Sequence, residues 1–152
     1  MYSVMLYLHS YLRWALLILG LYLVVRAFLN LRANPADKDD TKWLRLFVIL
    51  FDVQVIVGIL LYAAFSPVVH QAMQNFSNAM KTTAPRFWAV EHPTVMLLSL
   101  ILAHVANFKV KRAGDPRARN RVVLIYLGIA VLLMLVMTPW PFGQTHRPLF
   151  RF

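Results

Sequence analysis

The sequence predicts an all-α integral membrane protein, an up-down-up-down bundle of four helices with a short amphipathic helix at its outer end. Of its 152 residues, 60% are hydrophobic and only 14% are charged, which lies outside the usual balance of soluble domains. The apolar residues are gathered into four long blocks. Each block approaches the ~20 residues that an α-helix needs to cross a hydrocarbon core about 30 Å thick.

The four blocks form a single transmembrane domain that covers residues 1–152. We expect the spans at about residues 4–25, 44–65, 87–108 and 122–140, that is Val4–Val25, Leu44–Phe65, Phe87–Phe108 and Val122–Met137 extended through Thr138-Pro139-Trp140. The first span is too long for a cleavable signal peptide, and no basic segment precedes it. Short connections favour antiparallel neighbours, so the first and third spans should be parallel and diagonal to one another.

A further short helix is expected between the second and third spans. Ser66-Pro67 has the pattern of a helix start, with serine as the N-cap and proline at the first helical position. Apolar residues then recur at helical spacing, namely Val69, Met73, Phe76 and Met80. This pattern predicts an amphipathic helix on the outer membrane surface, with His70 on its polar, solvent-exposed face.

Positive charge is concentrated in two of the connections. The connections after the first and third spans hold most of the 16 Lys and Arg residues, at positions 26, 32, 38, 42, 45, 109, 111, 112, 117, 119 and 121, against 81, 86, 147 and 151 on the other side. The positive-inside rule therefore places the basic loops in the cytoplasm and both termini in the periplasm, in the inner membrane of a bacterium. We interpret these charges as contacts to anionic lipid of the bilayer, with no nucleic-acid partner.

Two histidines are the first candidates for function. His9 and His92 are each the sixth residue of their spans, and these spans run in the same direction, so both side chains should lie at one depth near the outer face. Ionisable groups there are costly and indicate a functional site. Two imidazoles that face each other across a bundle are what a haem iron needs as axial ligands. With no cysteine in the chain, a thiolate metal site or a covalently attached haem is excluded.

Arg13 lies four residues after His9 and shares its helix face. An arginine this deep must pair or face water. Asp52 reaches nearly the same level, and we first expect an Arg13–Asp52 pair that fixes the register of the helices. The alternative is that Arg13 binds a haem propionate or a quinone oxygen. Glu91 is the other nearby carboxylate, and a quinone site formed by His9, Arg13 and Glu91 is a further hypothesis.

The dipeptide His92-Pro93 opens the third span. Proline removes one backbone hydrogen bond, so the carbonyl that it frees needs another partner. His92 is either an interfacial residue bonded to Glu91, a carbonyl or a headgroup, or an axial ligand whose second ring nitrogen is oriented by an acceptor. His104 lies near the cytoplasmic end, where a second haem is not expected, and His146 in the C-terminal segment is expected to be exposed.

The sequence also resembles a known family. Its motifs are His9-Ser10-x-Leu12-Arg13-Trp14, Val57-Gly58-x-Leu60-Leu61-Tyr62, Arg86-Phe87-x-x-x-Glu91-His92 and Pro139-Trp140-Pro141-Phe142. In order and position these are similar to small bacterial four-span membrane proteins labelled cytochrome b. The resemblance implies a haem b protein of an electron-transport chain, with His9 and His92 matching the family's histidines and Trp14 among the cofactor contacts. Asp52 departs from the family, where similar sequences tend to have histidine.

Three functions are compatible with these residues. The first is an electron carrier with one haem b near the outer face, which takes electrons from quinol or passes them to a periplasmic carrier or another membrane redox subunit. The second is a cofactor-free structural subunit of a larger membrane complex. The third is copper handling by His9, His92 and His146 with thioethers, the candidates being Met5, Met73, Met80 and Met96. The chain has no P-loop, Rossmann pattern or nucleophile elbow, which favours a carrier or subunit over a stand-alone enzyme.

Overall fold

A computed structural model describes residues 1–33 and 41–141, and within these ranges all regular structure is helical. The elements are α1 (Tyr2–Arg32), α2 (Thr41–Leu60), η1 (Leu61–Phe65), α3 (Pro67–Gln74), α4 (Phe76–Ala79), α5 (Thr83–Arg86), η2 (Phe87–Glu91), α6 (His92–Arg112), α7 (Pro116–Val122), η3 (Val123–Leu127) and α8 (Gly128–Val136). The three η elements are π-helical turns inside longer helices. Such turns hold one extra residue and are frequent at functional sites.

Four continuous helices are long and apolar enough to cross a membrane, which confirms the predicted fold class. They are Tyr2–Arg32, Thr41–Phe65, Thr83–Arg112 and Pro116–Val136. All four extend past the apolar blocks at one or both ends. The last ends at Val136, so Thr138-Pro139-Trp140 follows the helix and does not extend it. Proline disfavours the helical conformation of the residue before it, which explains this end point.

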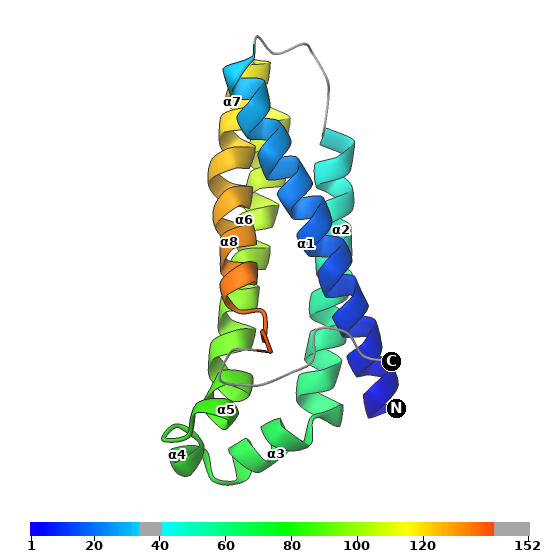
Figure 1. The fold of residues 1–152 in the computed structure, drawn as a ribbon, viewed down its shortest axis with the longest axis vertical. Coiled ribbons are helices and arrows are strands. Elements are labelled where there is room, and N and C mark those ends of the chain that lie inside the picture. Colours follow the sequence, from blue (N-terminus) through cyan, green and yellow to red (C-terminus); the bar gives the residue numbers. More distant parts are fainter. Residues whose placement is uncertain (34–40, 142–152) are drawn as a thin grey trace.

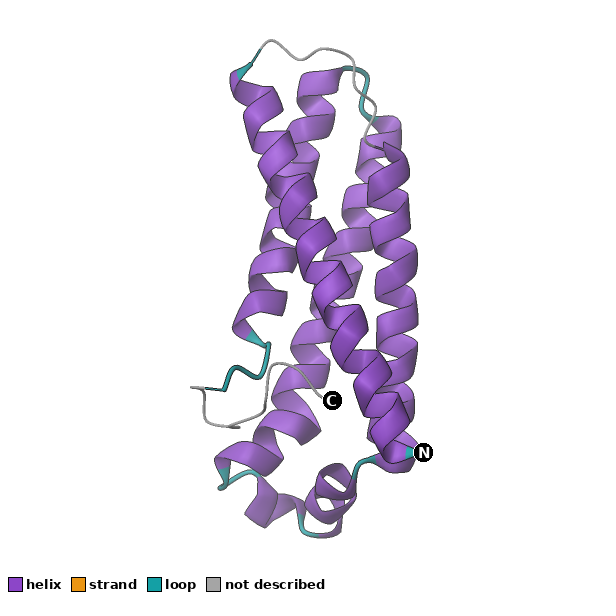
Figure 2. Cartoon of the chain, turned by 45° about the vertical axis from the view of Figure 1, so that its right-hand side comes forward, coloured by secondary structure: helices purple, strands orange, loops and turns teal. Residues whose placement is uncertain are grey.

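The helices form an antiparallel ring. α1 packs against α2 and α8, and α6 packs against the same two helices, while α7 and η3 continue the fourth helix along α1 and α6. Figures 1 and 2 show α1 and α6 running in the same direction on opposite corners of the bundle. The predicted parallel, diagonal placement of the first and third spans is therefore confirmed.

Small residues let the helix backbones approach in the core. A Cβ atom on Gly20 of α1 would lie 2.7 Å from Cγ2 of Val131 on α8 and 2.9 Å from Cε2 of Phe47 on α2. Ala103 and Ala106 of α6 are fully buried against the same core. Membrane helices commonly pack through small side chains. Lipid tails are as apolar as the helix surfaces, so the hydrophobic effect does not bring the helices together, and close van der Waals contact does.

The two ends of the bundle differ in chemistry. At one end, α1 and α6 finish and α2 and α7 begin among the basic residues, and we call this the basic end (Figure 1). There Asn30 Nδ2 donates to Asn120 Oδ1 at 3.4 Å and ties α1 to α7. At the other end, α1 begins and α3, α4 and α5 cross between α2 and α6. We call this the cavity end.

The helix expected after the second span begins as predicted and ends early. Ser66 caps α3, its Oγ accepting from the amide of Val69 at 3.4 Å, and Pro67 is the first helical residue. The helix stops at Gln74 because Asn75 caps a new helix, its Oδ1 accepting from the Asn78 amide at 3.2 Å.

This break also interrupts the predicted apolar stripe. Val69 is buried and Met80 is partly buried, whereas Met73 and Phe76 are exposed. His70 is exposed as expected, and its Nε2 lies 3.2 Å from the Ala63 carbonyl oxygen.

Gly20→Ala should destabilise the bundle. Valine is stiff at χ1 and Phe47 is fully buried, so neither neighbour can move aside easily, and overpacking of this kind costs about 1–3 kcal/mol. The measurement is the free energy of unfolding in mixed micelles titrated with a denaturing detergent. The matched control is Gly128→Ala, where the nearest atom to the added Cβ is 4.0 Å away, and which should be neutral or stabilising. Equal stability of the two variants would contradict this packing.

Candidate functional site

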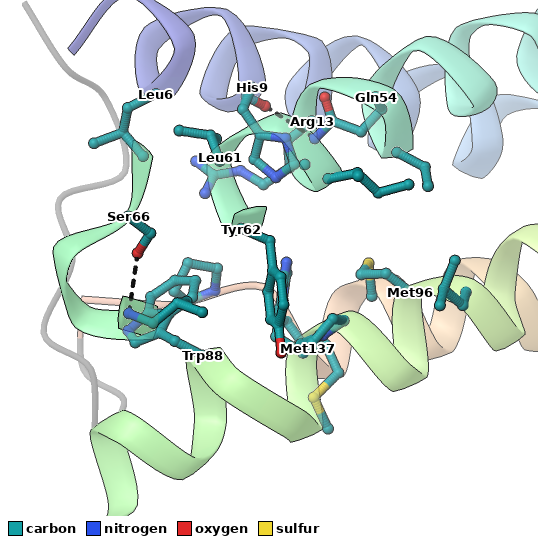
Figure 3. A pocket seen from close by; sticks show the side chains of 18 of the residues that line it. Leu6, His9, Arg13, Gln54, Leu61, Tyr62, Ser66, Trp88, Met96 and Met137 are labelled. Carbon is teal, nitrogen blue, oxygen red and sulfur yellow. Dashed lines mark hydrogen bonds between the residues drawn. The ribbon is translucent and has the colours of Figure 1, made fainter. Parts of the chain in front are cut away.

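A cavity of about 460 Å³ lies inside the cavity end of the bundle. Its walls come from α1, α2, η1, η2, α6 and the segment that follows α8, as Figure 3 shows in close-up. Most of the lining is apolar, and several polar side chains also line it, among them His9, Ser10, Arg13, Gln54, Tyr62 and His92. This volume falls in the range of roughly 300–1,000 Å³ that is typical of ligand and cofactor pockets.

The two histidines predicted to share one depth meet in this cavity. The ring centroids of His9 and His92 are 6.4 Å apart, and the ring planes make an angle of 69°. His9 comes from the first turns of α1, and His92 is the first residue of α6. Because α1 and α6 are diagonal, the imidazoles reach toward each other across the interior of the bundle.

His9 is held by the neighbouring helix α2. A Cβ atom on Gly58 would lie 3.2 Å from Cε1 of His9, so glycine at this position makes room for the ring. One turn earlier, Gln54 Nε2 donates to the carbonyl oxygen of His9 at 2.9 Å, drawn as the dashed line beside Gln54 in Figure 3. Nδ1 of His9 is buried without a hydrogen-bond partner among the described residues. Neither ring nitrogen of His9 is engaged in a hydrogen bond with a described residue.

His92 is oriented by the chain just after α8. Its Nδ1 lies 3.1 Å from the carbonyl oxygen of Met137. A carbonyl only accepts hydrogen bonds, so Nδ1 carries the proton and Nε2 carries the lone pair. The rings of Phe87 and Trp88 pack on the imidazole, with centroids 5.6 Å and 5.5 Å away. An acceptor behind a histidine is the arrangement that orients metal ligands, and here that acceptor is a backbone carbonyl.

A hydrogen bond from Tyr62 joins the two π-helical turns beside the cavity. In η2 the amide of His92 donates to the oxygen of Phe87 five residues back, so in this register the carbonyl that lacks a donor at Pro93 is that of Trp88. The hydroxyl of Tyr62 donates to the neighbouring oxygen, that of Ala89, at 2.9 Å. This bond joins η1 to η2 and thereby fixes the end of the second span to the start of the third. Tyr62 itself lines the cavity.

Glu91 lies apart from the cavity lining. Its Oε1 accepts from Nε of Arg86 at 2.6 Å, and both side chains are partly exposed. Nη1 of Arg86 also donates to the carbonyl oxygen of Met80 at 3.4 Å. The Arg86–Glu91 pair thus braces the turn from α5 into η2, and it does not bring Glu91 to His9 and Arg13 as the quinone-site hypothesis expected.

The expected pair of Arg13 with Asp52 is wrong. Arg13 lines the cavity, with Nη2 3.4 Å from Oγ of Ser10. Asp52 lies on the outside of the bundle and accepts a hydrogen bond from His104, with Oδ1 2.9 Å from Nε2. Residues two apart on a helix point to different faces, so the inward polar residue of α2 is Gln54 and Asp52 faces out.

Trp14 packs beside the core and away from the cavity lining. Its ring meets Trp140 edge to face, with centroids 6.3 Å apart. Nε1 of Trp140 donates to the carbonyl oxygen of Leu135 at 2.9 Å. Trp14 therefore anchors the chain after α8 to α1, which in turn positions the Met137 carbonyl behind His92.

Thioether groups also reach the cavity. Met96, Met134 and Met137 line it, and of these only Met96 was among the copper candidates. Met5, Met73 and Met80 are not among the lining residues. His146 lies outside the described residues. Within 1–33 and 41–141, no group of three or more His, Asp or Glu side chains could hold a metal ion.

Three contributors to the site were missed in the sequence. Gln54 is a polar residue within an apolar span, which is itself a sign of a buried contact. From the sequence, we instead expected Asp52, two residues earlier, to be the polar residue that faces the core. Tyr62 belongs to one of the motifs shared with the family, but the sequence does not indicate which group its hydroxyl bonds. The Met137 carbonyl has no signal in the sequence, because backbone atoms are the same at every position.

In comparisons with protein-family models, curated proteins and solved structures, nothing matches this chain.

Tyr62→Phe should loosen the cavity end. The buried oxygen of Ala89 would lose its donor, and polar contacts between membrane helices are worth about 0.5–2 kcal/mol. The measurement is protease susceptibility of the α3–α5 segment together with the free energy of unfolding in detergent. Tyr22→Phe is the matched control, because the Tyr22 hydroxyl only accepts from Arg26 on the exposed surface of α1. A Tyr62→Phe protein as resistant as the control would contradict the role given to this bond.

Proposed function

We propose that the protein binds haem b in its cavity and transfers electrons in a membrane redox chain, alone or as a subunit. The observation that carries this proposal is the meeting of His9 and His92 across the cavity, with Nε2 of His92 left free by the bond at its Nδ1 and with Nδ1 of His9 unpartnered among the described residues. Neutral imidazoles with free Nε2 atoms are the usual axial ligands of a low-spin haem.

The spacing of the two rings supports the proposal. A metal bonded to one nitrogen of each ring at about 2 Å would place the two ring centroids roughly 6.4 Å apart, since each centroid lies about 1.2 Å behind its nitrogen. The observed separation is 6.4 Å. Edge-to-face aromatic pairs also occur at centroid separations of about 4.5–7 Å, so the deciding evidence is spectroscopic.

The other lining residues have roles that suit this cofactor. Arg13 provides a cation near the imidazoles, suited to a propionate carboxylate. Val55 and Met96 contribute apolar side chains to the cavity wall. When bound, haem b would supply one-electron redox chemistry, and the protein would set its potential through the ligands, their hydrogen bonds and burial. The hydrogen bond from His92 to the carbonyl oxygen of Met137 is one contact through which the protein would set the potential.

The orientation of the bundle in the membrane is part of the same proposal. With the basic end in the cytoplasm of a bacterium, the cavity end and the N-terminus face the periplasm. The cavity is then near the outer leaflet, within reach of a quinol in the bilayer, a periplasmic electron carrier or another membrane redox subunit. The resemblance to small four-span proteins labelled cytochrome b supports this assignment.

A second candidate function is binding of copper in the same cavity. Three thioethers, from Met96, Met134 and Met137, line the cavity together with the two imidazoles. Thioether and imidazole ligands suit Cu(I). Metal analysis of the purified protein distinguishes copper from iron, and a protein with neither would favour the structural-subunit hypothesis.

The first test is the visible spectrum of the purified protein, oxidised and reduced with dithionite. We expect sharp b-type bands in the reduced protein, lost in both His9→Ala and His92→Ala, because a six-coordinate haem needs both nitrogens. His70→Ala is the matched control, since His70 is exposed on α3, and it should keep the bands. A colourless protein from haem-replete cells, or bands that survive in both cavity variants, would overturn the proposal.

A further inference from the structure

A second polar site lies on the outside of the bundle, facing the membrane. Nε2 of His104 on α6 and Oδ1 of Asp52 on α2 are 2.9 Å apart, and their side chains are 49% and 42% exposed. Asp52 is eight residues from Leu44 and His104 is four residues from Phe108, so they lie about 12 Å and about 6 Å along their helices from the basic end of the apolar blocks. Both therefore lie inside the apolar blocks.

The surface around this pair is apolar. On α2, the residues on the same helix face are Ile49, Ile56 and Ile59, and all three are exposed. On α6, the corresponding residues are Leu97, Ile101 and Phe108, which are exposed as well. We call this surface the α2–α6 face. Within the apolar blocks, the ionisable side chains on this face among the described residues are Asp52 and His104, together with Arg45 two turns nearer the basic end of α2.

The hydrogen bond between the two residues uses only half of their polar atoms. Oδ2 of Asp52 and Nδ1 of His104 have no hydrogen-bond partner among the described residues. Polar groups left unsatisfied in hydrocarbon cost free energy, and ionisable residues at such positions normally pair with a neighbour. The α2–α6 face therefore needs an occupant that offers one donor and one acceptor.

The two unused atoms specify that occupant. With the ring hydrogen on Nδ1, His104 donates from this atom, and Oδ2 of Asp52 is a carboxyl oxygen that accepts. One unused donor thus lies beside one unused acceptor on the same surface.

We infer that a second copy of this chain binds the α2–α6 face and that the protein is a two-fold symmetric dimer in the membrane. A two-fold axis places Nδ1 of His104 in one copy against Oδ2 of Asp52 in the other, and the reverse contact forms at the same time. All four polar groups are then satisfied in one closed ring. The surrounding isoleucine, leucine and phenylalanine side chains would seal this ring from lipid, the arrangement usual for an interface hot spot.

The absence of cysteine from the sequence allows a direct test. Ile56→Cys and Ile101→Cys each place one thiol about a helical turn from the polar pair. Treated with a short membrane-permeant bis-maleimide in native membranes, both should give a product of twice the chain mass. Ile18→Cys on α1, exposed to the same degree or more, is the matched control and should give little. Equal cross-linking at position 18, or a product containing a different protein, would overturn the inference.

A second variant tests the polar ring itself. Asp52→Leu/His104→Leu removes both polar side chains from a surface that already faces lipid, so the single bundle should remain folded, as its helical circular dichroism would show. We expect dimerisation to weaken by about tenfold, read as loss of cross-linking in the Ile101→Cys background. Unchanged cross-linking in this variant would show that the ring is not what joins the copies. Neither experiment depends on whether a haem is bound, so the inference and the proposed function fail separately.

Discussion

The structure depends on one constraint, that backbone groups within hydrocarbon must form hydrogen bonds inside the protein. This constraint makes all four spans helical, and it is most visible where the helical register changes. Beside the π-helical turn η2, the oxygen of Ala89 accepts from the hydroxyl of Tyr62, which belongs to another span. A local irregularity in one helix thereby becomes a fixed contact between two helices, located beside the cavity.

The candidate site follows from the order of the helices around the ring. Short connections make neighbours antiparallel, so α1 and α6 are parallel and occupy opposite corners. Residues at one depth on these two helices can only meet across the interior, which is where His9 and His92 lie. Gly58 and Gln54 on α2 hold one ring, and the carbonyl of Met137 orients the other. Each of the four spans or its flanking segment thus contributes to the site.

The sequence predicts the fold far better than it predicts the polar contacts. Apolar length, turn residues and helix starts determine the spans, their order and the capping of α3 by Ser66. They do not determine the rotation of a helix that is apolar on all sides, and this is why Asp52 was assigned to the interior and Gln54 was overlooked. α3 ends early at Gln74 because the side chain of Asn75 accepts a hydrogen bond from the backbone and starts a new helix. The apolar repeat, which continues past this point, does not reveal the break.

The alternating helix directions also determine the electrostatic background of the cavity. α1 and the helix that contains α6 present their amino ends there, whereas α2 with η1 and α8 present their carboxyl ends. A helix carries roughly half a positive charge at its amino end and half a negative charge at its carboxyl end. Two ends of each kind nearly cancel, so the scaffold itself favours neither anions nor cations in the cavity. The charge preference of this compartment is therefore left to its side chains, and it can change by substitution at a single position without any change of fold.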